Sequence, residues 1–477
     1  MSQPNIICLS IDSLRADFCS FLNEEELDTT PFLEKLSDDS AVYNNAYTPS
    51  TWTLPVHTSV FTGLFPPEHG ILNGGEKLGN HPTFADILKQ EGYSTAAYYQ
   101  NSWLDTGEIL NGFQTATREH DDSESPLRAR IADSIRSVSP RSEQIISKSY
   151  KTLSQIHESL DTYREWNGRS KLNEKKDRID QETIDKASDA IESLSDPFCW
   201  FVHLNGAHWK YNPPNPYHRK FTNRSLPDLV SNLVWEQGRI YGTRTNRLRV
   251  NAGYYQPPEQ EVSTIKNLYR GCILYCDHLL KILINALKDA GKWENTVLFV
   301  FGDHGDAFGE QGIFGHHFTV DDSVTHIPLL IRDPSDRIES GVIHSPASLV
   351  DIYPTILSLA GVSGPETLGI DLSNESREAT FTYYDVSGKD YYRDAPQRGV
   401  PHKDLPAGKQ YAVRRSSEES LVYYPDENEY CGPAKDDESL RSILHNHLDE
   451  MERVETETGE LSDEVSTRLE KMGYLRE

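Results

Sequence analysis

Three short, continuous apolar segments constrain the fold of this chain most strongly. They span Asn5–Ile11, Phe198–Leu204 and Thr296–Phe301, and an apolar run of this length is the pattern of a buried parallel strand. Helical patterns lie between them, among them Thr53–Phe61 and the long amphipathic stretch Glu259–Ala290. Because strands that alternate with helices pack as layers, the pattern predicts an α/β sandwich whose central, largely parallel sheet is flanked by helices.

The pattern changes after about residue 363, which predicts two domains in the 477 residues. Residues 1–363 are expected to form the main α/β domain, and residues 364–477 a small C-terminal α+β subdomain with an antiparallel sheet. Within the main domain, 119–194 is rich in serine and charged residues and is interpreted either as an inserted set of exposed helices or as a linker. The stretch 210–258, rich in Asn, Pro, Tyr and Arg, is interpreted as an irregular, variable loop.

The net charge narrows the range of partners. The chain carries 47 lysines and arginines against 74 aspartates and glutamates, a formal net charge of −27. Such a surface repels nucleic acid and anionic membranes, so no nucleic-acid partner is expected. The acidic residues are spread along the chain, which indicates either the solvated surface of a halophilic protein or an ordinary acidic protein. We favour the halophile because the charge is large for this length.

The cysteines and the first residues indicate the compartment. The six cysteines form no CxxC pair, and Cys8, Cys199 and Cys272 lie in apolar runs, as buried thiols do. No signal peptide precedes the first strand pattern, and no apolar run of about 18 residues offers a membrane span. These features predict a cytoplasmic protein without a membrane span, and no feature predicts an oligomeric state.

Two acidic residues follow the ends of predicted strands, Asp12 after Asn5–Ile11 and Asp303 after Thr296–Phe301. Because the carboxyl ends of strands gather at one edge of an open α/β sheet, both carboxylates are expected there. Two adjacent carboxylates repel each other unless a cation lies between them, and His304 adds a neutral nitrogen ligand. These side chains predict a site for one divalent ion, although each acid alone is more often a turn or cap residue. Oxygen ligands suit Ca²⁺, Mg²⁺ or Mn²⁺, and the histidine admits Zn²⁺.

A threonine opens one of the predicted helices. Thr53 follows a polar loop and begins the segment TLPVHTSVF. A hydroxyl at this position is favoured simply as a helix N-cap. The N-terminus of a helix also presents backbone N–H groups that bind anions, and a metal-bound hydroxyl there would be activated as a nucleophile. On the residues alone, both interpretations of Thr53 stay open.

Six segments carry a recognisable series of motifs. They are NIICLSIDSLRAD (5–17), TPFLEKLSDDSAVYNNAY (30–47), TLPVHTSVFTGLFPPEHG (53–70), VFGDHGDAFGEQGIFG (300–315), LVDIYPTILSLAGV (349–362) and RLEKMGYL (468–475). In this order they resemble the sulfatase-like branch of the alkaline phosphatase superfamily. The resemblance covers neither the segment 119–194 nor the loop 210–258. It implies an alkaline-phosphatase-like fold, with residues 1–363 as the catalytic domain.

The resemblance also implies how the ion is held. It assigns one divalent cation to Asp12, Asp303 and His304, and it places Thr53 in the nucleophile slot, where the hydroxyl would contact the ion. One departure stands out, because the family's usual pair of aspartates is Asp12-Ser13 in this chain. One acidic ligand is therefore missing, which weakens the case for Ca²⁺.

Three histidines take further positions of the family pattern. His57 stands where the family's signature has an arginine, His316 stands where a later lysine touches the substrate, and His208 lies in the loop after a core strand. The resemblance implies that His57 and His317 bind substrate and that His208 or His316 protonates the leaving group, as an imidazole can near neutral pH. A purely structural role is an equal alternative for His57 and His317.

The side chain of Thr53 shapes the predicted activity. Sulfatases of this family oxidise a cysteine or serine in this slot to an aldehyde, formylglycine, which a threonine cannot form because its Cβ carries a methyl group. Unmodified threonine is the nucleophile of relatives that transfer or hydrolyse phosphoryl groups. The resemblance therefore predicts a metal-dependent hydrolase or transferase, such as a phosphodiesterase or phosphotransferase, acting on small anionic esters. These are phosphate mono- or diesters or related sulfate or phosphonate esters. The alternatives are a sulfatase that works without formylglycine and a degenerate relative that only binds an anion.

Overall fold

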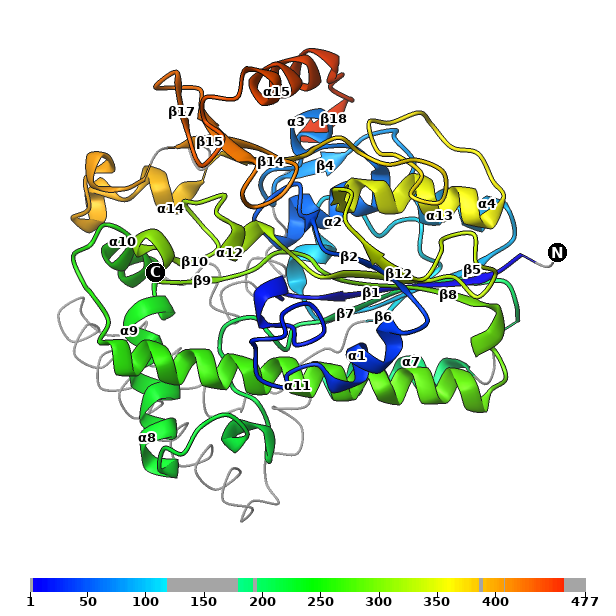
Figure 1. The fold of residues 1–477 in the computed structure, drawn as a ribbon, viewed down its shortest axis with the longest axis horizontal. Coiled ribbons are helices and arrows are strands. Elements are labelled where there is room, and N and C mark those ends of the chain that lie inside the picture. Colours follow the sequence, from blue (N-terminus) through cyan, green and yellow to red (C-terminus); the bar gives the residue numbers. More distant parts are fainter. Residues whose placement is uncertain (1–2, 118–178, 192–194, 386–388, 407, 459–477) are drawn as a thin grey trace, which may run out of the picture.

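The computed structural model describes residues 3–117, 179–191, 195–385, 389–406 and 408–458 (Figure 1). Most of the segment 119–194 lies outside the described residues, and so does the RLEKMGYL segment near the C-terminus. The described part of the segment forms helix α7.

The α-helices of the described residues are α1 (Pro31–Ser37), α2 (Thr53–Thr62), α3 (Pro66–His69), α4 (Phe84–Gln90), α7 (Ile179–Ile191), α8 (Leu226–Ser231), α9 (Gln237–Tyr241), α10 (Arg244–Asn251), α11 (Glu259–Asp289), α12 (Asp322–Thr325), α13 (Ile352–Ala360), α14 (Asp390–Arg393) and α15 (Glu438–Glu450). The strands are β1 (Asn5–Ile11), β2 (Ala41–Tyr43), β3 (Ala46–Tyr47), β4 (Glu76–Leu78), β5 (Ser94–Tyr98), β6 (Thr115–Thr117), β7 (Phe198–Leu204), β8 (Thr296–Gly302), β9 (Ala307–Phe308), β10 (Phe314–Gly315), β11 (Leu329–Arg332), β12 (Gly341–Ile343), β13 (Ala347–Ser348), β14 (Thr380–Asp385), β15 (Lys409–Arg414), β16 (Ser420–Tyr424), β17 (Glu429–Cys431) and β18 (Thr456–Thr458).

One eight-stranded sheet organises the molecule, in the order β12-β2-β11-β8-β1-β7-β5-β6. β1 lies inside it and pairs in parallel with β7 and β8, and β5 continues the sheet in parallel beyond β7. β11 is antiparallel to both of its neighbours. The predicted α/β fold with a largely parallel sheet is confirmed, and the three core strands begin and end within one residue of the predicted positions.

Alternate residues of β1 face opposite layers. Ile7 and Leu9 belong to a buried cluster with apolar residues of α1, α7 and α11, whereas Ile6 and Cys8 belong to a second cluster with residues of α2, α4 and α13. Figure 1 shows these two groups of helices on opposite sides of the sheet. Burying one such isoleucine or leucine side chain stabilises the fold by about 1.5–3 kcal/mol. Both faces of the sheet are thereby covered, which leaves the strand ends as the place for polar chemistry.

The stretch 210–258 differs from the prediction of an irregular loop, because it contains the short helices α8, α9 and α10. Two of them begin at side-chain caps: Ser225 accepts the N–H of Asp228, and Thr243 accepts the N–H of Asn246. Leu229 packs into the main core. Helices this short are marginal by themselves, so packing and caps stabilise them more than local sequence does.

The C-terminal residues form a four-stranded antiparallel sheet, β14 to β17, and α15 packs on it through Leu440 and Leu444. β14 is tied to the loop that leads into α2, because the Thr382 hydroxyl donates to the Thr48 carbonyl at 2.6 Å. The N–H of Tyr383 likewise donates to the Pro49 carbonyl. Among the described residues, no helix is both long and apolar enough to cross a membrane.

His447 of α15 offers a test of buried-histidine energetics. Its ring stacks on Phe381 with 3.6 Å between centroids, and burial lowers its pKa to about 3. The unfolded chain binds this proton near pH 6.5, so the free energy of unfolding should fall as the pH drops from 6.5 towards 3, by about 1.4 kcal/mol per pH unit. His447→Phe should remove this contribution in denaturant titrations on either side of about pH 6.5. An unchanged pH dependence would contradict this expectation, and His344→Phe at an exposed histidine is the control.

Candidate active site

The register of three strands makes Asp12 and Asp303 neighbours. Ile11 of β1 lies opposite both Leu204 of β7 and Gly302 of β8, so the residues that follow leave the sheet together. The N–H of Asp303 donates to the Ile11 carbonyl at 3.3 Å, and the N–H of Asp12 donates to the Leu204 carbonyl at 2.8 Å. Both aspartate side chains are fully buried at this edge of the sheet.

Asp12, Asp303 and His304 offer three ligand atoms that all lie within 4.8 Å of one another. His304 Nε2 is 3.5 Å from Asp12 Oδ1 and 3.7 Å from Asp303 Oδ2. The Nδ1–H of His304 donates to the Gly305 carbonyl at 2.9 Å, so its Nε2 carries a lone pair. Neither this Nε2 nor Asp303 Oδ2 has a hydrogen-bond partner among the described residues. Buried atoms of this kind require a partner, and the group fits a divalent cation.

The pKa values of these three residues also indicate that a cation belongs among them. Burial raises the pKa of Asp12, but the nearby imidazoles of His208, His203 and His304 outweigh it and hold that pKa below the ordinary value. Burial and the negative charge of Asp12 raise the pKa of Asp303 well above its ordinary value. Burial and His316 lower the pKa of His304 to about 3. Without a cation, therefore, the two carboxylates cannot both ionise at low cost.

Two glycines that flank Asp303 and His304 are required by close backbone contacts. A Cβ on Gly302 would lie 2.3 Å from the Leu14 carbonyl oxygen, and one on Gly305 would lie 2.3 Å from the Ser323 carbonyl oxygen. Neither carbonyl belongs to a flexible side chain that could move away. The two glycines of the motif GDHG are therefore needed because Asp303 and His304 are packed closely between neighbouring segments.

Ser13 occupies the position of the missing second acid and supports the other two. Its backbone is in the left-handed region, with φ at 58°. From there its N–H donates to Asp303 Oδ1 at 2.9 Å, and its hydroxyl donates to Asp12 Oδ1 at 3.0 Å. Ser13 therefore orients both carboxylates instead of adding a third one.

Thr53 begins α2 and is 3% exposed. Asn101 links it to the metal group, the name used here for Asp12, Asp303 and His304 together. The Asn101 Oδ1 accepts the N–H of Trp103, which fixes the amide so that Nδ2 is the donor. This Nδ2 lies 2.9 Å from Asp12 Oδ2 and 3.3 Å from Thr53 Oγ1. Sequence reasoning missed Asn101. The available signal was its position just after the predicted strand at residues 95–99.

His57 lies one turn after Thr53 on α2 and is bonded to the backbone of that residue. Its Nδ1–H donates to the Thr53 carbonyl at 2.8 Å, and its Nε2 is 2.9 Å from Ser10 Oγ. The ring packs against Phe61 and Phe201 and has no exposed surface. Burial lowers its pKa well below the ordinary value. Both ring nitrogens are engaged inside the protein, so the predicted contact of His57 with substrate has no donor or acceptor to make it.

The other three predicted histidines gather near the metal group. The ring centroid of His316 is 4.6 Å from that of His304, 5.7 Å from that of His208 and 4.4 Å from that of His317. Burial, His316 and the cations Arg247 and Lys389 lower the pKa of His317 well below its ordinary value. The positive charge beside these histidines therefore comes from Arg247 and Lys389, two residues of separate segments, and it suits an anion.

Asp306 supports His316 and was also missed by sequence reasoning. Its Oδ1 accepts the Nδ1–H of His316 at 2.8 Å, and its Oδ2 accepts the hydroxyl of Tyr211 at 2.5 Å. Burial raises the pKa of Asp306, but His316 outweighs it and lowers that pKa below the ordinary value. A carboxylate that holds an imidazole N–H in this way fixes the tautomer and leaves Nε2 available for proton transfer.

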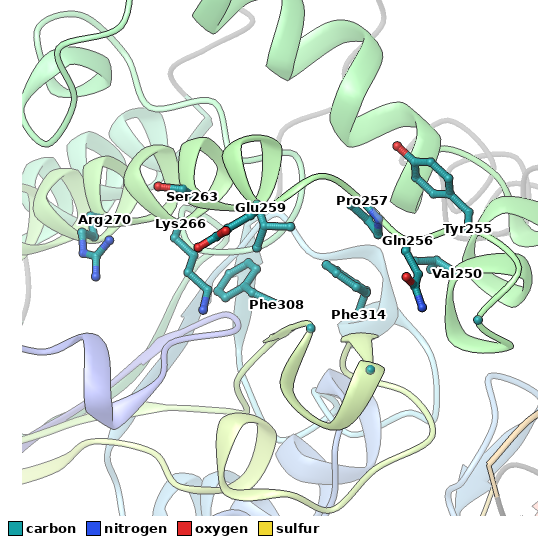
Figure 2. A pocket seen from close by; sticks show the side chains of 14 residues that line it. Val250, Tyr255, Gln256, Pro257, Glu259, Ser263, Lys266, Arg270, Phe308 and Phe314 are labelled. Carbon is teal, nitrogen blue, oxygen red and sulfur yellow. The ribbon is translucent and has the colours of Figure 1, made fainter.

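A cavity of about 500 Å³ lies next to this supporting layer (Figure 2). Its lining includes Tyr255, Phe308 and Phe314, and the ring of Phe308 also packs against Tyr211. Lys266, which points into the cavity, is 3.4 Å from the Glu310 carboxylate. None of the three residues of the metal group lines the cavity.

Comparisons with known proteins agree with this geometry. The family model described as Sulfatase matches residues 4–362. The chain is 23% identical over 420 residues to an arylsulfatase of Clostridium perfringens, covering 84% of this chain and 85% of the relative. Its fold is similar to phosphonate monoester hydrolases of Silicibacter pomeroyi (TM-score 0.64, 18% identity) and Agrobacterium radiobacter (TM-score 0.65, 17% identity), with 94% of each chain covered. Enzymes of this family use a divalent metal ion and hydrolyse esters. The chain belongs to the sulfatase family of the alkaline phosphatase superfamily and is a sulfatase-family hydrolase.

Proposed function

We propose that this protein hydrolyses small anionic phosphate mono- or diesters with Thr53 as the nucleophile. The observation that carries the proposal is the position of the Thr53 hydroxyl, which shares the Asn101 amide with Asp12 of the metal group. Thr53 is unable to form the aldehyde of formylglycine sulfatases, because its Cβ carries a methyl group. The fold resemblance to phosphonate monoester hydrolases supports chemistry at phosphorus.

Asp12, Asp303 and His304 would hold one divalent ion in this site. When bound, the ion acts as a Lewis acid on the ester oxygen and lowers the pKa of a bound hydroxyl. Two carboxylates and an imidazole suit Mn²⁺ or Zn²⁺ better than Ca²⁺, which prefers a larger number of oxygen ligands.

The reaction would run in two steps on this chain. Thr53 loses its hydroxyl proton to solvent, and its Oγ1 forms a bond to phosphorus as the bond from phosphorus to the leaving oxygen breaks. His316 or His208 gives that oxygen a proton. Water then attacks the phosphothreonine and releases phosphate or a phosphate monoester. An alcohol in place of water would make the same site a phosphotransferase.

A substrate panel tests the proposal. The metal-loaded protein is given matched aryl esters of phosphate, of a phosphodiester, of a phosphonate and of sulfate. Turnover of a phosphorus ester and one added phosphoryl mass on the intact protein after rapid quenching are expected. Turnover of the sulfate ester alone would contradict the proposal and establish the second candidate, a sulfatase without formylglycine, which the arylsulfatase relative favours. Binding of these anions without any turnover would instead indicate the non-catalytic relative.

We also propose that the protein works in the cytoplasm of a halophilic organism. A net charge of −27 is expected to keep the folded protein soluble and active in molar salt, which activity and unfolding measurements from low to molar KCl would test. All six cysteines are free thiols and five of them are buried, which supports the cytoplasmic location predicted from the sequence. Loss of the fold in molar KCl would contradict the halophilic interpretation.

Asp306→Asn should slow the chemical step without loss of the metal ion. The neutral amide no longer stabilises a protonated His316 or orients its ring as firmly, and we expect kcat to fall about 10²-fold or more for alkyl esters. Esters of 4-nitrophenol should lose much less, because this leaving group needs no proton. Measured kcat for the two classes of ester, beside the metal content, gives the result.

Tyr211→Phe is the matched control, because it removes only one hydrogen bond from the same carboxylate. Its kcat should stay much closer to that of the wild type. An equal loss of kcat for alkyl and 4-nitrophenyl esters in Asp306→Asn would show that Asp306 does not act through proton donation to the leaving group.

A further inference from the structure

Lys389 comes from the C-terminal part of the chain, yet it lies against the start of helix α2. It directly precedes α14, and its Nζ is 3.4 Å from the ring centroid of Trp52, the residue before Thr53. The same Nζ donates to the Leu72 carbonyl at 2.7 Å. Contacts with two separate segments therefore hold this ammonium group beside the residue that precedes the proposed nucleophile.

Trp52 connects the ammonium group to the polar contacts of the site. Its side chain is 8% exposed, and its ring meets that of Trp103 edge to face, with 5.1 Å between the centroids. The N–H of Trp103 donates to Asn101, whose amide also contacts the Thr53 hydroxyl. The position of the ammonium group is therefore fixed relative to that hydroxyl by packed aromatic rings.

The packing of α14 brings the same lysine near the histidine side of the site. Tyr392 of α14 packs on Phe318, with 6.3 Å between the ring centroids, and Phe318 directly follows His317. Burial, His316 and nearby cations that include Lys389 lower the pKa of His317. Lys389 therefore borders both the segment that supplies the proposed nucleophile and the segment that supplies a candidate proton donor.

The charges already described at the site leave an anionic ester in need of a further cation. The carboxylates of Asp12 and Asp303 offset the charge of a divalent ion, and His316 faces the Asp306 carboxylate at 2.8 Å. A lysine ammonium group is a compact point charge with three N–H donors, and it binds phosphoryl oxygens well. It can therefore bind a substrate while it keeps its contact with a backbone carbonyl.

We propose that Lys389 binds the non-bridging oxygens of the anionic ester that reacts at Thr53. The ring of Trp52 and the Leu72 carbonyl position the ammonium group for this contact. The inference rests on the proposed reaction and adds a substrate preference. A phosphate monoester carries close to two negative charges above about pH 7. A phosphodiester carries one, so Lys389 should favour the monoester.

Titration of the metal-loaded full chain with inorganic phosphate tests this contact without any turnover. Lys389→Gln should weaken phosphate binding by about 10-fold or more in calorimetry. Lys389→Met, which keeps an unbranched side chain on the Trp52 ring, should show the same loss, and Lys389→Arg should show a smaller one. Unchanged phosphate affinity in the Gln and Met variants would overturn the proposal and leave Lys389 as a structural contact.

Lys409→Gln is the matched control, because Lys409 of β15 lies in the same part of the chain and faces Asp385 at 3.9 Å. It should leave the phosphate affinity unchanged. In Lys389→Gln, kcat/KM should fall more for an aryl phosphate monoester than for the matching diester, whereas equal losses would contradict the contact with the ester. If neither ester is turned over, the phosphate titration still decides the role of Lys389, so the two proposals can fail separately.

Discussion

Thr53→Ala is expected to lower kcat for phosphoester hydrolysis by at least about 10³-fold, equivalent to about 4 kcal/mol of transition-state stabilisation. The loss should be this large because the Ser13 hydroxyl beside the site already donates to Asp12 Oδ1, whereas Asn101 links the Thr53 hydroxyl to Asp12. Zn²⁺ binding should persist, since Asp12, Asp303 and His304 remain. Steady-state kinetics beside a metal titration would give both values, and no phosphorylated protein should accumulate.

Thr53→Ser is the matched variant, because it keeps the hydroxyl and removes only a methyl group. It should retain most of the activity and should still form the covalent intermediate. Thr58→Ala lies on the same helix, where the hydroxyl donates to the Leu54 carbonyl, and it tests for general damage to α2. Wild-type kcat in Thr53→Ala would show that another group attacks the ester.

Asp303→Asn should make the metal-free protein more stable and at the same time weaken its binding of the metal ion. In the metal-free protein, burial and the charge of Asp12 raise the pKa of Asp303, so ionising both carboxylates costs stability. The amide removes that repulsion, and the metal-free variant should unfold at a higher temperature than the metal-free wild type. At about 100 times the Kd, metal stabilises the wild type by about 2.7 kcal/mol. The variant should lose this response, which calorimetry with and without Zn²⁺ would show.

Asp333→Asn is a suitable control for this experiment. Asp333 also follows a strand and is buried, but it pairs with Arg337 away from the metal group. Its replacement should destabilise the protein by removing one side of an ion pair while leaving the response to Zn²⁺ unchanged. An equal rise of Tm with Zn²⁺ in Asp303→Asn and the wild type would show that Asp303 does not hold the ion.

The core strands and the metal group could be predicted because their signals are local. β1, β7 and β8 are continuous apolar runs, and Asp12 and Asp303 are the first residues after β1 and β8. Any parallel arrangement of such strands brings their ends to one edge. The short helices of 210–258 were not predicted, because their stability comes from caps and from packing of side chains such as Leu229.

The supporting residues required the three-dimensional structure. Asn101 lies in no motif, and Asp306 lies in the segment 300–315 without any pattern that marks its contact with His316; both contacts depend on how separate segments pack. The assignment of His57 needed it as well. Its place in a motif implied substrate contact, whereas burial shows it bonded to Ser10 and to the backbone of its own helix.

By itself, the sequence determined the α/β fold, the strand ends at which polar residues gather, and that residue 53 is a threonine, which cannot be oxidised to an aldehyde. These follow from local apolar patterns and from the covalent structure of single side chains. Only the tertiary structure decided which side chains share hydrogen bonds at the site, and hence the tautomers of His57 and His304. A hydrogen bond depends on distances of a few tenths of an ångström between segments far apart in the chain, and only packing sets those distances.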